Sequence, residues 1–142
     1  MKQRKLWALL LAAALLLALP GFVAFAESSA ETGAWVPTVW VYVKTDTAEG
    51  FLPLPEDEAG SYTYPLTQIR ADGTHAVNNI RVTPEGVFME SATCDSQDCV
   101  HQGVLTLANR ELRPLGNFII CLPHRVWLSL YTTEEILSLF GQ

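Results

Sequence analysis

The chain has 142 residues, 49% of them hydrophobic, and carries nine basic against 15 acidic residues. Residues 1–26 hold three of the basic and none of the acidic residues, so the chain beyond them has a net charge of −9. This length suits one domain rather than a two-domain enzyme, and a negative charge without a Lys/Arg cluster beyond residue 5 argues against a nucleic-acid partner.

The N-terminal segment has the three parts of a secretory signal peptide. Met1–Lys5 is positively charged, Leu6–Leu19 is apolar, and Ala24-Phe25-Ala26 fits a cleavage site. Residues 1–26 are therefore expected to be a signal peptide, or else an uncleaved membrane anchor, since residues 6–26 are long enough to cross a bilayer. Either way the domain is expected to be secreted or to lie on the extracytoplasmic face of the cell membrane, with the membrane a partner only through an uncleaved segment.

The first part of the remaining chain predicts a tether and then a β domain. Residues 27–34 are small and polar and indicate a flexible tether, and residues 35–142 are expected to form a single domain. Trp35–Lys44 is rich in Val, Trp and Tyr and predicts a strand. The two prolines and the acidic run of Thr45–Gly60 predict a loop, and Ser61–Leu66 predicts a short strand that ends at Pro65.

The rest of the chain predicts further strands and one helix. His75–Thr83 and Val87–Ala92 alternate around a Pro-Glu-Gly turn and predict a hairpin, followed by a polar loop, Thr93–Gly103, and a weak strand, Val104–Ala108. Asn117–Leu122 and Arg125–Tyr131 predict a second hairpin, and a capping box at Thr132 and Glu135 predicts a short C-terminal helix. About seven short strands and one helix predict an all-β domain, a small β-barrel or β-sandwich.

Three cysteines, Cys94, Cys99 and Cys121, leave one thiol over if any two form a disulfide. Cys94 and Cys99 enclose four residues and pair locally if their Cα atoms come within about 7 Å. Alternatively one of them pairs with Cys121, which closes a loop of roughly 20 residues and stabilises the fold by about 3 kcal/mol through chain entropy. Export to an oxidising compartment favours a structural disulfide, and the pairing stays open.

Two histidines beside these cysteines give an alternative, a metal site of Cys99, His101, Cys121 and His124. Their order, C-x-H and then C-x-x-H, matches a Rieske 2Fe–2S centre, and their types match a Cys2His2 zinc site. The residues that follow each pair, Val104 after the glycine and Arg125 after the histidine, depart from Rieske loops. Zinc is therefore preferred to 2Fe–2S, and a domain without a cofactor is preferred to both.

The cysteine segments resemble the signature of a known family. A cysteine, four residues, C-V-x-x-G, a gap and I-x-C-L-P-x-[KR]-V describe that signature, and the matching positions are Cys94, Cys99, Gly103, Cys121, Leu122 and Pro123. The family is the one named after NusG domain II, an inserted domain of some NusG proteins, and the resemblance extends over about Thr38–Tyr131. It implies a small β-rich fold and a stand-alone secreted or membrane-anchored member of unknown role. It implies no transcription factor, because the chain shows neither the N-terminal domain of NusG nor its KOW motif.

No catalytic motif accompanies these features. The cysteine spacing is C-x4-C rather than C-x-x-C, and neither G-x-S-x-G nor H-E-x-x-H occurs. The sequence therefore predicts an exported, non-enzymatic β domain, cross-linked by cysteines of its C-x4-C and CLPH loops, that binds a partner protein or small ligand at the cell surface. The alternative is a metal or electron-transfer module that uses the four Cys and His residues.

Overall fold

The computed structural model describes residues 36–141. The predicted signal peptide or anchor (residues 1–26) and the predicted tether (residues 27–34) lie outside the described residues. Between residues 36 and 141, no helix has the length and apolar character needed to cross a membrane.

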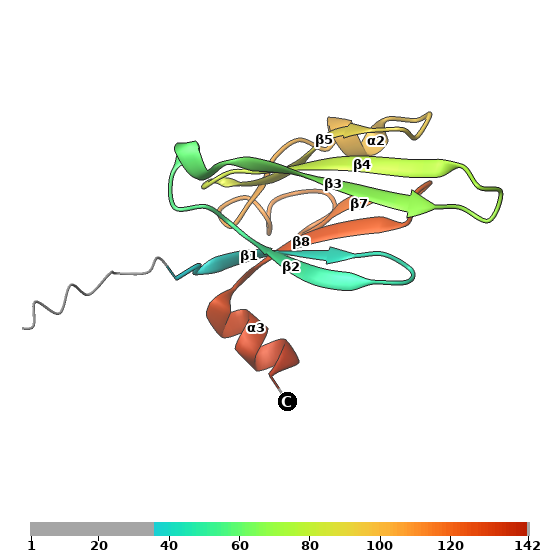
Figure 1. Cartoon of the computed structure of the whole chain (residues 1–142). Coiled ribbons are helices and arrows are strands. Elements are labelled where there is room, and N and C mark those ends of the chain that lie inside the picture. Colours follow the sequence, from blue (N-terminus) through green and yellow to red (C-terminus); the bar gives the residue numbers. More distant parts are fainter. Residues whose placement is uncertain (1–35, 142) are drawn as a thin grey trace, which may run out of the picture. The chain divides into compact units, whose positions relative to one another are not determined.

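Eight strands in the described part of the chain form two four-stranded antiparallel sheets (Figure 1). In spatial order, the first sheet contains β2 (Glu49–Pro53), β1 (Val39–Lys44), β8 (Val126–Thr132) and β7 (Ile119–Cys121). The second contains β3 (Tyr62–Ile69), β4 (His75–Val82), β5 (Gly86–Ala92) and β6 (Leu105–Thr106). The predicted all-β class is confirmed, and of the two predicted architectures the sandwich is present.

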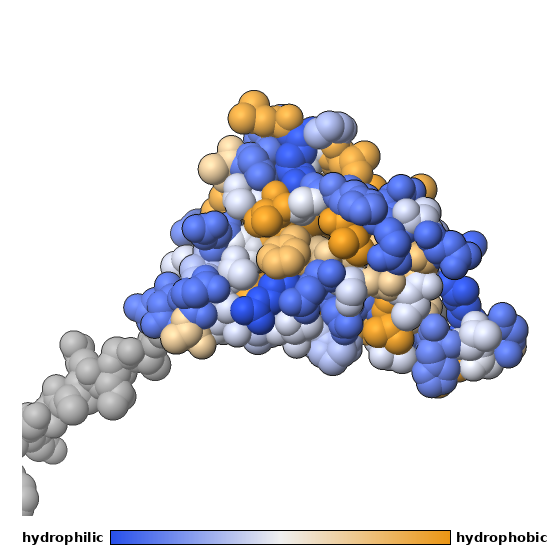
Figure 2. All heavy atoms as spheres, turned by 90° about the horizontal axis from the view of Figure 1, so that it is seen from above, coloured by the Kyte–Doolittle hydropathy of each residue, from blue (hydrophilic) through white to orange (hydrophobic). Residues whose placement is uncertain are grey.

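The core lies between the two sheets. Along β4 every second residue is buried, as the period of two along a strand requires when one face is covered. The inward side chains of both sheets belong to one buried cluster: Val41, Val43, Ile80, Val82, Val87, Met89, Leu128 and Leu130. Burying each such side chain contributes about 1.5–3 kcal/mol, so this cluster holds the sheets together. In the view onto the second sheet, hydrophilic side chains are spread over the surface, and apolar ones lie near its middle and at its upper edge (Figure 2).

Three short helices complete the described chain: η1 (Glu58–Gly60), α2 (Asp98–His101) and α3 (Thr133–Phe140). The predicted capping box at the start of α3 is confirmed. The Glu135 amide donates to the Thr132 hydroxyl at 3.2 Å, and the Thr132 amide donates to the Glu135 carboxylate at 2.8 Å. Both bonds satisfy backbone groups that a helix start otherwise leaves without partners.

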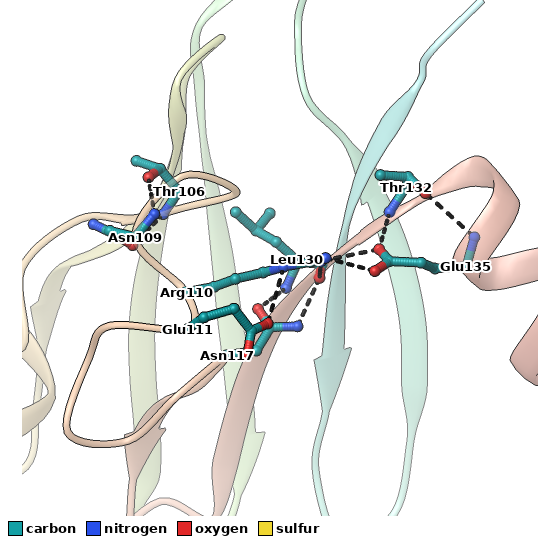
Figure 3. A network of polar contacts seen from close by, with 8 residues as sticks. All are labelled: Thr106, Asn109, Arg110, Glu111, Asn117, Leu130, Thr132 and Glu135. Carbon is teal, nitrogen blue, oxygen red and sulfur yellow. Dashed lines mark hydrogen bonds and ion pairs between the residues drawn. The ribbon is translucent and has the colours of Figure 1, made fainter.

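A polar network joins the β6–β7 connection to β8 and α3 (Figure 3). The Arg110 guanidinium donates to the Leu130 carbonyl at 3.1 Å and to both carboxylate oxygens of Glu135, at 2.9 and 2.5 Å. The Asn117 side chain bonds both backbone groups of Leu130, at 2.7 and 3.0 Å, and so continues the pairing of β8 beyond the short strand β7. Hydrogen bonds from Arg110 and from the Thr132 backbone lower the pKa of Glu135 to about 2.

Two predictions about residues 45–69 are wrong. The segment predicted as a loop, residues 45–60, contains β2, which pairs with β1 through a turn in which the Thr45 hydroxyl accepts the amides of Thr47 and Ala48. The strand predicted to end at Pro65 continues to Ile69. Because β3 is an edge strand, a proline there sacrifices no ladder hydrogen bond when its nitrogen faces away from the neighbouring strand.

Candidate functional site

The three cysteines come from different elements and meet between the two sheets. Cys94 follows β5 of the second sheet, Cys99 lies in α2, and Cys121 is the last residue of β7 in the first sheet. Their side chains are buried, with exposed fractions of 5%, 1% and 1%. The cluster therefore touches both layers of the sandwich at one end of the core.

Two glutamine side chains hold the loop that carries Cys99. Gln97 adopts a left-handed conformation with φ of 56°, and its side-chain amide donates to the Ala92 carbonyl at 2.8 Å and also to the Cys94 carbonyl. Gln102 bonds both backbone groups of Ile120, each at 2.8 Å, and so occupies the free edge of β7 like a further strand residue. The first contact fixes α2 to the end of β5, and the second fixes it to β7.

The three sulfur atoms all lie within 4.8 Å of one another. The Sγ atoms of Cys94 and Cys99 are 3.7 Å apart, and all three residues are free thiols in this structure. Within residues 36–141, no other group of three or more His, Cys, Asp or Glu ligand atoms comes together in this way. The arrangement offers either a disulfide between two of the thiols or a site that uses all three sulfurs.

Burial disfavours ionisation of the Cys99 thiol. Desolvation raises the pKa of the Cys99 thiol, and the contacts with Cys121 and Cys94 raise it further, because each neighbour disfavours a second negative charge. A thiol of raised pKa is a poor nucleophile, since the thiolate is the reactive form. The geometry therefore gives no support to a catalytic thiol at Cys99.

A small pocket of about 120 Å³ lies over the cluster. The three cysteines line this pocket together with a few polar side chains and a rim of apolar ones. The apolar rim includes Leu115, Leu122 and Pro123. Leu122 is 73% exposed and Leu115 is 43% exposed. The sulfurs thus form part of the wall of a pocket that opens to the surface between exposed apolar side chains.

The structure does not bring His101 and His124 to the sulfur atoms. His101 is exposed at the end of α2, and neither histidine belongs to the ligand group that the cysteines form. The fold therefore does not assemble the set of Cys99, His101, Cys121 and His124 that the sequence suggests. Only its two cysteines lie together.

His124 is instead buried, with 4% of its surface exposed, in the turn between β7 and β8. Its Nδ1–H donates to the side-chain oxygen Oδ1 of Asn78 at 2.7 Å. Oδ1 is assigned as the acceptor because the Nδ2 amide of Asn78 donates to the Met89 sulfur at 3.4 Å. Burial, together with the positive charge of Arg70, lowers the pKa of His124. A neutral His124 therefore connects the turn to β4 of the opposite sheet.

The remaining signature residues have structural places that the sequence did not reveal. Gly103 follows α2 with a φ of +72°, a conformation that glycine adopts without strain and that ends a helix. Leu122 and Pro123 are exposed and line the pocket. Asn78, Gln97 and Gln102 were not predicted as site residues, because an amide side chain in a strand or a polar loop carries no distinguishing spacing.

These features define the class of the molecule: a small two-sheet β domain with three buried cysteines between its sheets. The sequence pattern of NusG domain II matches residues 7–134, and the chain belongs to that family. The resemblance expected from the cysteine signature is thereby confirmed. A search among curated proteins finds no match to this sequence.

Solved structures share this fold. The crystal structure of the Lin0431 protein from Listeria innocua is 21% identical over 68% of this chain and 98% of that one, with a TM-score of 0.52. The solution NMR structure of the same protein is 20% identical over 71% of this chain and 79% of that one, with a TM-score of 0.53. A DUF1312 family protein (EF3258) from Enterococcus faecalis V583 is 22% identical over 68% of this chain and 99% of that one, with a TM-score of 0.49. At these identities the two Lin0431 structures support the fold alone.

Proposed function

We propose that the chain is an exported, non-enzymatic domain, secreted or held at the extracytoplasmic face of the cell membrane, whose cysteines cross-link its C-x4-C and CLPH segments. The observation that carries the proposal is the convergence of three buried sulfurs, within 4.8 Å of one another, from segments of both sheets. In the proposal, the pocket over the cross-link is where the domain binds a partner protein or a small ligand.

The surroundings of the sulfurs support a cross-link rather than a catalyst. The three thiols are buried, and burial raises the pKa of Cys99. No His, Asp or Glu of the described chain belongs to the group of ligand atoms that the sulfurs form. A cross-link here ties α2 to one or both of the strands that flank it, β5 and β7. Cross-linking stabilises a small domain chiefly because it restricts the unfolded chain.

Exposed apolar side chains at the rim support the choice of the pocket as the binding surface. Leu122 lies in a tight turn with 73% of its surface exposed, and the buried His124 of the same turn is hydrogen-bonded to Asn78. A rigid, partly apolar concavity with a few polar groups is the usual form of a binding site. The β7–β8 turn thus presents an apolar side chain at the pocket rim from a fixed backbone.

The experiment has two arms, both using the full chain expressed with a tag after Gln142. In the first, protease is added to intact cells; export is supported if the tag is cleaved or is found in the medium, and overturned if the tag is protected until the cells are lysed. In the second, the recovered protein is denatured, and its thiols are alkylated in one sample without reductant or chelator and in another with both. A cross-link predicts that fewer than three thiols react in the first sample and that all three react in the second. Three thiols that react in the first sample would overturn it.

A further inference from the structure

The number of sulfurs that converge distinguishes between the two forms of cross-link. A disulfide uses two cysteines, yet the third, Cys121, lies within 4.8 Å of both others and is 1% exposed. A metal ion uses all three. Soft thiolate ligands select zinc, Cu(I) and iron–sulfur clusters among the metals that proteins bind.

We propose that Cys94, Cys99 and Cys121 together bind one zinc ion, with the fourth coordination position directed to the pocket that these residues line. This inference rests on the proposed function, because it names the form of the same cross-link and the chemistry of the same pocket. It replaces the Cys/His ligand set suggested by the sequence, since the histidines lie apart from the sulfurs.

The sulfur positions suit tetrahedral zinc. Zn–S bonds of about 2.3 Å at tetrahedral angles place neighbouring sulfurs about 3.8 Å apart. The Cys94 and Cys99 sulfurs are 3.7 Å apart, so this pair needs almost no movement. The Cys121 sulfur, within 4.8 Å of both, needs a shift of no more than about an ångström to reach the same geometry. A disulfide requires a much larger approach, to about 2.0 Å.

Binding is balanced by the release of protons. One zinc ion and three thiols give one zinc tris-thiolate and three protons, with no change of oxidation state. The complex carries a single negative charge, which is far less costly to bury than three separate thiolates. The Gln97 side-chain nitrogen lies 3.9 Å from the Cys94 sulfur, so a polar group stands beside this ligand, as is common around metal ligands.

The open position explains why the sulfurs line a pocket rather than being sealed in the core. Closed structural zinc sites have four protein ligands, whereas sites with three protein ligands bind water or an incoming group at the fourth position. The described pocket presents Ser96, Asp98 and Gln102 beside the sulfurs. The partner class that fits is therefore a protein or small molecule that offers one carboxylate, imidazole or thiolate donor at an apolar tip.

The test begins with zinc content. The full chain is purified from cells that express it, reduced under anaerobic conditions and incubated with zinc. Unbound zinc is then removed. One zinc per chain, with three sulfurs at about 2.3 Å and one lighter atom in X-ray absorption, is the expected result. Two or fewer sulfurs around the zinc would overturn the proposal. This measurement uses the wild-type chain and does not depend on any variant folding.

Variants then assign the ligands. Cys121→Ser is expected to lose stoichiometric zinc, whereas His101→Asn and the exposed control His75→Asn retain it; loss of zinc in His101→Asn would overturn the three-cysteine site. Far-ultraviolet circular dichroism confirms that each variant is folded. A disulfide that persists in protein purified without reductant, with no zinc uptake after reduction, would overturn the zinc site and leave the proposed cross-link standing. Three free thiols that neither pair nor bind zinc would overturn both.

Discussion

Replacing Asn78 with alanine tests whether His124 is a structural residue. The Asn78 side chain is completely buried and bonds the His124 Nδ1–H at 2.7 Å. Asn78→Ala leaves that N–H buried without a partner, which costs about 1–3 kcal/mol. The space left by the amide adds about 1 kcal/mol. We therefore expect the free energy of unfolding to fall by about 2–4 kcal/mol and the Tm to fall by about 10–20 °C.

Asn79→Ala is the matched control. Asn79 is the next residue of β4, faces the opposite side and bonds the Ser91 hydroxyl at 2.8 Å on the outer surface. Because water replaces that bond, we expect a loss of less than about 1 kcal/mol. Urea titrations at neutral pH measure both variants against the wild type. Equal losses in the two variants would refute the argument, because they would show that the buried bond to His124 is worth no more than an exposed one.

Three further predictions concern a glycine and two titratable groups. Gly86→Ala is expected to lose about 3 kcal/mol of stability, because the added Cβ would lie 2.0 Å from a backbone oxygen of β6. The control Gly50→Ala is expected to lose less than about 1 kcal/mol, because no atom lies within 4 Å of the added Cβ. Similar urea midpoints for the two variants would contradict this prediction. Arg110 and the helix cap lower the pKa of Glu135 to about 2. The carboxylate therefore contributes its full share of folding stability above the ordinary glutamate pKa, and this share is lost as the pH falls toward about 2. Because the side chain is 35% exposed, this contribution to the free energy of unfolding is about 1 kcal/mol. Glu135→Gln retains the capping geometry and is expected to lose less stability in acid than the wild type. Urea titrations at several pH values measure this, and the same pH dependence in both proteins would contradict the prediction. The pKa of His124 is lowered by burial, so the unfolded chain binds the proton more readily, and stability is expected to fall as the pH drops below about 6.5. Thermal melts of His124→Asn should show a Tm that depends less on pH over that range. The same pH dependence as in the wild type would contradict the prediction that His124 causes it.

Much of the fold was predictable because one face of each long strand is buried. The alternation in residues 75–92 identified β4 and β5, and the Thr132/Glu135 spacing identified the start of α3. Strand β2 was missed because Glu49–Pro53 has little burial of its own: it is an edge strand, and pairing with β1 rather than local pattern makes it a strand. The continuation of β3 through Pro65 was missed for the same reason, since the sequence does not tell which strands are edges.

The candidate site was predictable in its residue types and not in its grouping. The cysteines are separated by five and 22 positions, and such spacings do not reveal that α2 lies between β5 and β7. The grouping depends on Gln97 and Gln102, whose side chains bond backbone groups of the neighbouring elements. Glutamine in a polar loop is ordinarily solvated, so nothing in the sequence marked these two as the residues that position Cys99.

The CLPH segment shows why a similar residue order does not bring the same residues together. In this tight turn Cys121 and His124 both point inward, but toward different neighbours: the sulfur lies beside Cys94 and Cys99, and the imidazole lies against Asn78 of β4. The residues between them, Leu122 and Pro123, point outward to the pocket rim. A Rieske or Cys2His2 site needs the cysteine and histidine of each loop to face one centre, whereas here a single turn divides them between the cysteine cluster and the packing of the sheets. The C-x-x-H order in this chain is thus compatible with a tight turn whose two end residues are both buried and face different neighbours.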